Sequence, residues 1–260
     1  MNGDDAALLA ALPGWAFGFV LVLARVSAAV TLLPVVGEAE LPMTVRAGVA
    51  LALTILLLPA VTALLPAAPT DPVLAASMVL AEIVTGLWLG WLARLLVQAL
   101  PMAGQFAAYM LGLSNVLQPD PILGAQASVL ARLFGLAAPV LLLASGLYAV
   151  PLAGLAASFR LIPPGRLLPA GDATQTVVAG VAEAFALALR LASPFVVVSI
   201  VWQIGTALLA RVVPRLQIYM AAMPGQILGG LLLVGVLASV LAATWLEAVR
   251  DGFARLPGAG

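Results

Sequence analysis

The feature that most constrains this chain is a series of six apolar stretches along its 260 residues. Each stretch has the roughly 20 residues that an α-helix needs to cross the ~30 Å hydrocarbon core of a bilayer. Leucine, alanine and valine dominate the stretches, and none of them alternates apolar and polar residues as a half-buried strand does. The stretches cover residues 12–33, 43–65, 73–100, 127–159, 176–209 and 225–246.

The overall composition excludes a water-soluble globular enzyme. Hydrophobic residues make up 64% of the chain and charged residues only 8%, whereas soluble domains are about 45–50% apolar and about 25% charged. A soluble globule of this length cannot bury that much apolar surface. The 24 glycines and 19 prolines predict that the helices are interrupted. We therefore expect an all-α, integral membrane or membrane-embedded protein with about six long, broken hydrophobic helices arranged as helical hairpins.

The polar residues exclude several kinds of chemistry. The chain has no histidine, no cysteine and no lysine, and its 11 arginines balance 11 acids to give a net charge of +0. These absences argue against a Cys/His metal site, a thiolate nucleophile, an imidazole base and a lysine Schiff base. A basic surface for nucleic acid is excluded as well. We predict no catalytic residues, no metal, no cofactor and no nucleic-acid partner.

Charged and amide side chains nevertheless occur within or near the apolar stretches. A charge at mid-bilayer costs about 2.5–3.5 kcal/mol on insertion scales, so such side chains face a protein interior or water. They either line an ion or substrate path, or pair with neighbouring helices and reach the membrane interface. The residues are Arg25, Glu82, Arg94, Arg132, Glu183, Arg190 and Gln203.

Small residues at helical spacing predict close helix packing. Glu82, Gly86 and Gly90 recur every four residues on one stripe, and Gly225 and Gly229 repeat the spacing in the last stretch. Such small-xxx-small patterns let two backbones approach closely in membranes. Arginine counts select no orientation, because five arginines lie on one side of the six spans and four on the other. Either some stretches do not span the membrane, or assembly rather than lipid fixes the topology.

Proline and glycine predict where the helices begin and end. Thr70-Asp71 is a candidate helix cap, and Pro139 and Pro151 interrupt the fourth stretch. Pro214 and Pro224 bracket a short link before the sixth. The segment 101–126 is apolar enough to be buried, yet too rich in Gly, Asn and Pro to be one straight helix. It is either an ordinary loop or an irregular segment covered by protein or water.

Five groups of residues, in order from about residue 16 to about 245, resemble the FliR family of flagellar and injectisome export-gate proteins. They read ARVS at 24–27, LPVVG at 33–37 and LPMTVR at 41–46; EIVTGLWLG at 82–90; AGQ at 103–105, MLGLS at 110–114, DP at 120–121 and GAQ at 124–126; SFRLIPPG at 158–165; and VPRLQIY at 213–219, MPG at 223–225 and GG at 229–230. The chain departs from the family pattern at 145–148 and 221–224.

The resemblance implies a place in a protein-export machine. A FliR-type chain is a single-copy subunit that assembles with several FliP-type and FliQ-type subunits, and with a FlhB-type subunit, into a helical pore. The pore passes unfolded export substrates through the bacterial inner membrane, in contact with lipid, at the flagellar basal body. Residues 1–175 would be a FliP-like portion and 176–260 a FliQ-like hairpin with a C-terminal tail.

The resemblance also implies a plug loop that closes the pore at rest. Its residues would be Met110, Leu111, Gly112, Leu113, Ser114, Asn115, Val116, Leu117, Gln118, Pro119, Asp120, Pro121, Gly124 and Gln126. The residues expected in helix packing and assembly are Arg25, Glu82, Gly86, Gly90, Gly225 and Gly229.

Two other functions remain open from the sequence. An injectisome gate would have the same architecture. A small-solute secondary transporter would have broken helices as well, but should show internal repeats, and the segment 101–126 has no counterpart in the second half of the chain.

Overall fold

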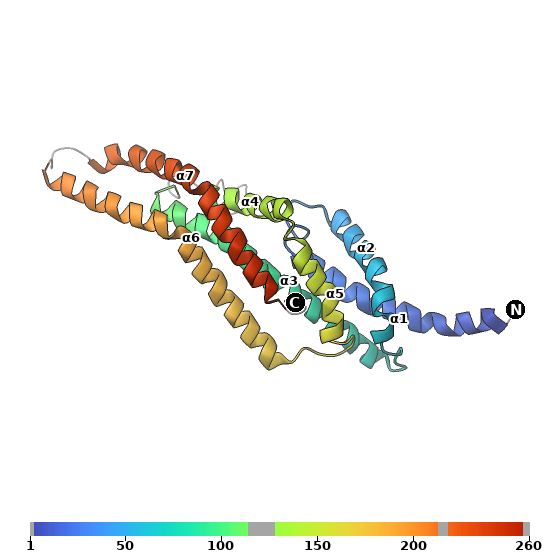
Figure 1. Ribbon diagram of the computed structural model, residues 1–260. Helices are drawn as coiled ribbons and strands as arrows, with labels where there is room; N and C mark the ends of the chain where they lie inside the picture. The colour runs from blue at the N-terminus through green and yellow to red at the C-terminus, as the bar shows by residue number, and fades with distance from the viewer. Residues whose placement is uncertain (1–2, 114–127, 213–217, 257–260) are drawn as a thin grey trace. The chain divides into compact units, whose positions relative to one another are not determined.

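The computed structural model describes residues 3–113, 128–212 and 218–256, and this part of the chain folds into seven α-helices and one short 3₁₀ helix (Figure 1). No described residue lies in a β-strand, so the all-α prediction is confirmed. The elements are α1 (Gly3–Leu32), α2 (Met43–Val61), η1 (Thr62–Leu64), α3 (Pro72–Met110), α4 (Val129–Ser145), α5 (Ala149–Leu161), α6 (Ala170–Val212) and α7 (Ile218–Ala254).

The helices have the length and composition of membrane spans. In the described residues five helical segments are long and apolar enough to cross a bilayer, or up to six if α4 and α5 form one bent span, in agreement with the expected number. Large apolar side chains lie exposed along them, as lipid or neighbouring subunits would require. Examples are Val140, Val201, Val212, Leu232 and Val236.

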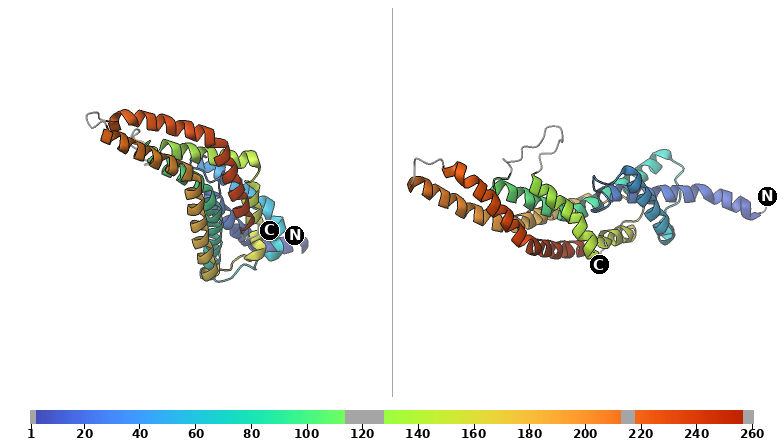
Figure 2. Two further views of the ribbon diagram at one scale, coloured as in Figure 1. Left: turned by 60° about the vertical axis from the view of Figure 1, so that its left-hand side comes forward. Right: turned by 90° about the horizontal axis from the view of Figure 1, so that it is seen from above.

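The chain divides into two compact units. The first unit comprises residues Met1–Leu95, Ser145–Gly180 and Asp251–Gly260. Within it α1 and α2 pack side by side (Figures 1 and 2). Its core combines Val22 and Val26 of α1 with Phe159 of α5, all 0% exposed.

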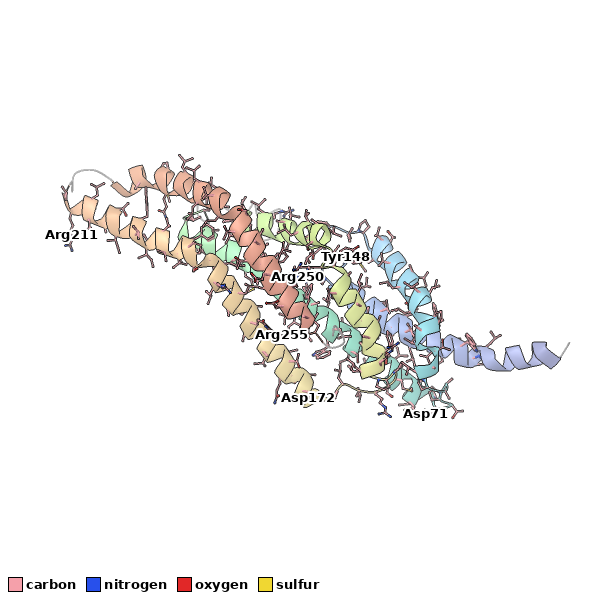
Figure 3. All side chains as sticks on the ribbon, in the orientation of Figure 1. Asp71, Tyr148, Asp172, Arg211, Arg250 and Arg255 are labelled. Atoms are coloured by element: carbon pink, nitrogen blue, oxygen red, sulfur yellow. The ribbon has the colours of Figure 1, made fainter. Side chains whose placement is uncertain are left out.

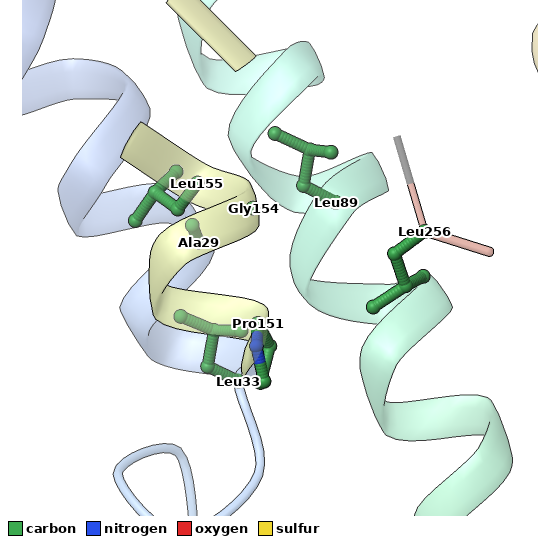
Figure 4. A pocket seen from close by; sticks show the side chains of 7 residues that line it. All are labelled: Ala29, Leu33, Leu89, Pro151, Gly154, Leu155 and Leu256. Atoms are coloured by element: carbon green, nitrogen blue, oxygen red, sulfur yellow. The ribbon is translucent and has the colours of Figure 1, made fainter. Parts of the chain in front are cut away.

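A small apolar cavity shows how closely the first unit is packed. Its volume is about 10 Å³, room for about one water, and its lining comes from α1, α3, α5 and the segment after α7 (Figure 4). Leu256, which follows α7, lines this cavity and so contributes to the packing of the first unit.

Helices α1 and α3 approach each other closely in the first unit. A Cβ atom added to Gly90 would lie 2.7 Å from the Ala29 carbonyl oxygen, and one added to Gly86 would meet the Arg25 carbonyl oxygen at even shorter range. The two glycines therefore let the α3 backbone rest directly on the α1 backbone, which is the geometry that the small-xxx-small spacing allows.

The second unit comprises residues Leu96–Ala144 and Val181–Arg250. The end of α3 packs against α4 at Gly104, where an added Cβ would lie 2.9 Å from the Ala131 Cα. The later part of α6 and the first part of α7 run together, and Gly225 of α7 would contact the Trp202 ring at 3.2 Å through an added Cβ. Leu191, Phe195 and Trp245, which are 2%, 0% and 0% exposed, form much of the core.

Two expected breaks lie elsewhere than predicted. The helix α3 continues through Pro101 to Met110, because Ala103, Ala107 and Ala108 are buried and their packing outweighs the hydrogen bond that proline removes. Pro224 likewise lies inside α7 instead of ending a link.

The fourth stretch breaks between its two prolines instead of at them. Pro139 lies inside α4 and Pro151 lies in the first turn of α5, where its missing N–H is tolerated. The break falls after Ser145, at Gly146, whose φ of +74° suits glycine.

Charged side chains mark several helix ends. The predicted cap before α3 is confirmed, because the Val73 backbone N–H donates to the Asp71 carboxylate at 2.9 Å, with Pro72 in the first helical position. In α6 Asp172 lies in the first turn and Arg211 in the last, which complements the helix dipole (Figure 3).

The glycine contact between α1 and α3 gives a first prediction. Gly86→Ala should destabilise the first unit by about 1–3 kcal/mol, because the added methyl group would collide with the α1 backbone at Arg25, which can move away only by disturbing the packing around it. Gly48→Ala in α2 is the matched control: its Cβ would meet nothing within 4 Å, so better helix propensity should leave stability equal or raised by up to about 1 kcal/mol. Thermal unfolding in detergent measures both, and equal effects would contradict the contact.

Candidate functional site

A buried ion pair joins α1 to α3 in the first unit. The Arg25 Nε donates to Glu82 Oε2 at 2.6 Å and the Arg25 Nη2 donates to Glu82 Oε1 at 3.0 Å. Both side chains are 0% exposed. A two-pronged arginine–carboxylate contact is the geometry in which such a pair is strongest, and it fixes the register of the two helices.

The end of α5 and the turn after it complete the cluster. Arg25 also donates to the Ser158 hydroxyl at 3.3 Å and to the Ile162 carbonyl oxygen at 2.9 Å, and the Gly165 N–H donates to Glu82 Oε1 at 2.7 Å. The Phe159 ring lies 4.2 Å from the guanidinium carbon, measured to its centroid, and adds a cation–π contact. The side chains of Arg25 and Glu82 thus connect three elements: α1, α3 and the 158–165 segment.

This cluster holds α1, α3 and the 158–165 segment together. Each Glu82 oxygen accepts an N–H donor, and one of them accepts two. Because all these donors belong to the protein, the carboxylate is bound on every side. The geometry accounts for two of the charged residues in apolar stretches as partners of each other within one chain.

A second, half-buried ion pair holds the turn between α1 and α2. Arg94 of α3 donates to the Glu38 carboxylate at 3.2 Å and to the Gly37 carbonyl oxygen at 3.3 Å. Gly37 is itself enclosed, since an added Cβ would lie 2.6 Å from the Thr31 carbonyl oxygen. The exposed fractions of the Arg94 and Glu38 side chains are 22% and 20%, so solvent weakens this pair relative to the first.

The predicted plug residues lie only partly within the described chain. Met110 is the last residue of α3, Leu111 is 2% exposed, and Gly112 has a φ of +73°. The other end of the segment is held by the Gln105 side chain, which accepts the Ser128 N–H at 2.9 Å. The residues Ser114, Asn115, Val116, Leu117, Gln118, Pro119, Asp120, Pro121, Gly124 and Gln126 lie outside the described residues.

The remaining predicted residues lie apart from the ion pair. Gly225 faces Trp202, whereas an added Cβ on Gly229 would meet nothing within 4 Å. Their neighbour Gly230 makes the closer contact, 2.8 Å from a Leu111 side-chain carbon to an added Cβ. Glu183 and Arg190 line one cavity of about 200 Å³ in the second unit.

Several polar residues at these places were missed by sequence reasoning. Ser158 completes the ion-pair cluster, and Ser199 and Gln226 donate to the Met110 carbonyl oxygen. The available signal was weak: each is an uncharged polar side chain within or beside an apolar helix, and such side chains usually bond to a neighbouring group there.

Comparison with known proteins gives a consistent result along nearly the whole chain. The family described as bacterial export proteins, family 1, matches residues 16–252. The flagellar biosynthetic protein FliR of Caulobacter vibrioides is 29% identical over 231 residues, which cover 89% of this chain and 92% of that protein. The proteins of the same name from Bacillus subtilis and Escherichia coli are 25% and 26% identical, over 86% and 85% of this chain and 86% and 84% of their own lengths.

The buried pair gives the second prediction. Glu82→Gln should lower the free energy of unfolding by about 3–5 kcal/mol, because Arg25 is left buried without its counter-charge. Thermal unfolding in detergent measures the loss, and Glu40→Gln, an exposed acid of the same unit, is the control.

Replacing both partners with apolar residues distinguishes the effect of a buried, unpaired charge on stability from the effect of lost packing. The double variant Arg25→Met with Glu82→Met should be more stable than Glu82→Gln alone, because no uncompensated charge remains buried. A double variant as unstable as the single one would contradict this account of the pair.

Proposed function

Since this chain belongs to family 1 of the bacterial export proteins, we propose that it is a core subunit of the flagellar type III protein export gate, which helps to form and close the pore for unfolded flagellar subunits. The observation that carries the proposal is the extent of the match, which covers residues 16–252 and so includes every helix of the described chain from the middle of α1 to the last turn of α7. The relatives from three bacteria bear a flagellar name, which favours the flagellum over an injectisome.

The proposed place of the chain is the bacterial inner membrane at the flagellar basal body. Its proposed partners are FliP-type and FliQ-type subunits and a FlhB-type subunit, with residues 1–175 forming the FliP-like portion and 176–260 the FliQ-like hairpin. Long apolar helices with exposed large side chains support this, because such surfaces need lipid or neighbouring subunits to cover them.

The gate is proposed to act by position and not by chemistry. The only acid that the structure buries completely among the described residues, Glu82, is engaged by Arg25 and Gly165. The energy for export would then come from other parts of the machine.

Within this gate, residues 110–126 are proposed to plug the pore at rest. Their sequence is apolar, and Asp120 is the one formal charge between Arg94 and Arg132, so they offer a seal that does not retain water. The described residues at both ends of the segment are tied to the second unit, at Met110 through Ser199 and at Ser128 through Gln105. Fixed ends are what a segment needs in order to return to one closed position.

Native mass spectrometry tests the assembly. The tagged chain, expressed with its FliP-type and FliQ-type neighbours and extracted in mild detergent, should appear as one copy in a complex with several copies of the others. A monomer or homodimer, with both partners expressed but absent, would contradict the gate and favour a transporter.

Permeability tests the plug. Removing four residues from 115–123 should raise potassium leak from vesicles that contain the assembled complex, without changing the subunit composition. Removing four residues from 66–69, in the link between η1 and α3, is the control and should leave the leak unchanged. A correctly assembled complex that stays tight after the first deletion would rule out the plug.

A further inference from the structure

Three helices change from charged to uncharged sequence close to one cavity of the second unit. In α6 the 20 residues between Arg190 and Arg211 carry no charge. In α7 the first charged residue is Glu247, and in α3 no charged residue follows Arg94. A helix of 20 residues is about 30 Å long, which is the thickness of the hydrocarbon core of a bilayer. Arg190 and Arg211, both exposed, therefore mark the two ends of a bilayer-length segment of α6.

The cavity lies where these uncharged segments begin. Its volume is about 200 Å³, and its lining contains one basic and one acidic side chain: Leu96, Glu183, Ala186, Leu187, Arg190 and Ala248. Leu96 comes two residues after Arg94, and Ala248 comes directly after Glu247, so all three helices reach the cavity at the level where their charges end. A cavity of this size is smaller than the about 300–1,000 Å³ that a drug-sized ligand occupies, and it suits a small polar group.

The two charged side chains of the cavity are complementary to a ligand that carries both charges. Within the described part of the chain Arg190 forms no ion pair, whereas Arg25 and Arg94 each bind a carboxylate. Glu183 precedes Arg190 by seven residues, about 10 Å along the helix, so the two lie on one face but too far apart to pair as neighbours in adjacent turns do. A group placed between them with an anion toward Arg190 and a cation toward Glu183 would bind both.

An exposed apolar stripe runs along α6 from this level. Val197, Val201, Ile204 and Leu208 are each more than half exposed, and they are three or four residues apart, which places them on one face of the helix. Arg190 precedes this stripe at the cavity. A polar group bound at the cavity thus has a continuous apolar surface next to it, as the acyl chains of a phospholipid require.

We infer that this cavity binds the headgroup of phosphatidylethanolamine, whose phosphate accepts hydrogen bonds from Arg190 and whose ammonium group donates to Glu183. Guanidinium binds phosphate through two parallel N–H donors, and ammonium–carboxylate contacts are charge-assisted as well. Phosphatidylglycerol offers the phosphate without the ammonium group. The site would fix the depth of α6 and α7 in the membrane, and it does not depend on the proposed gate.

Native mass spectrometry of the full chain in mild detergent tests the site. The chain is titrated with phosphatidylethanolamine and, separately, with phosphatidylglycerol, and the fraction that retains one lipid gives a Kd for each. Phosphatidylethanolamine should bind about tenfold more tightly. Arg190→Gln should weaken its binding about ten- to hundredfold, because charge-assisted hydrogen bonds to the phosphate are lost. The control is Arg211→Gln, an exposed arginine of the same helix outside the cavity lining, which should leave both values unchanged.

The acid is tested by lipid preference. Glu183→Gln should bring the affinity for phosphatidylethanolamine down to that for phosphatidylglycerol, because the ammonium group loses its carboxylate while the phosphate keeps Arg190. A residue that serves folding alone would weaken both lipids by the same factor, and that result would overturn the role of Glu183. If Glu183→Gln does not fold, the preference of the unmodified chain decides, and equal Kd values for the two lipids would overturn the inference.

Other occupants give different results. Release of the bound lipid by millimolar inorganic phosphate would identify a soluble anion as the ligand and overturn the inference. Arg190→Gln that retains lipid but no longer assembles with FliP-type and FliQ-type subunits would show that Arg190 binds an acidic side chain of a subunit, which also overturns it. A chain that prefers phosphatidylethanolamine but fails to assemble with those subunits would confirm the lipid site and contradict the gate.

Discussion

Arg25 and Glu82 place opposite charges in the interior of a chain whose helices are mostly apolar, and they tie together three elements of the first unit. Neither side chain is exposed to solvent, so each depends on the other and on the donors and acceptors of the 158–165 segment. The pair can form only because Gly86 lets α3 rest on the backbone of α1. The charges, the glycine spacing and the helix register therefore depend on one another. Losing one of the two charges would leave the other buried in an apolar interior without its partner.

The same constraint explains the second unit. An apolar environment leaves no water to satisfy a backbone carbonyl, so the end of a helix must find donors within the protein. At Met110 those donors come from α6 and α7, which contribute Ser199 and Gln226. The two units thus use the few polar side chains of this sequence for the same purpose, to hold helices at defined positions.

Particular elements show how far the sequence predicts this structure. The apolar stretches predict the helices, and Asp71 caps α3 as its place before Pro72 predicts. The breaks were harder to predict, because a proline removes one hydrogen bond whereas packing along a whole turn can compensate for it. Pro101 and Pro224 lie within helices, and the actual bend is at Gly146. Ser199 and Gln226 gave little signal, since nothing in a single stretch shows which distant carbonyl group a side chain will reach.

What the sequence by itself determined is the class of protein, all-α and membrane-embedded, because composition and the length of apolar runs are local properties. Its ordered motifs also pointed to the family that matches residues 16–252. Only the tertiary structure decided that Arg25 pairs with Glu82 and that Met110 is held by α6 and α7. The physical reason is that these contacts join residues 57, 89 and 116 positions apart, and such pairings depend on how helices pack and not on the residues next to them in the chain.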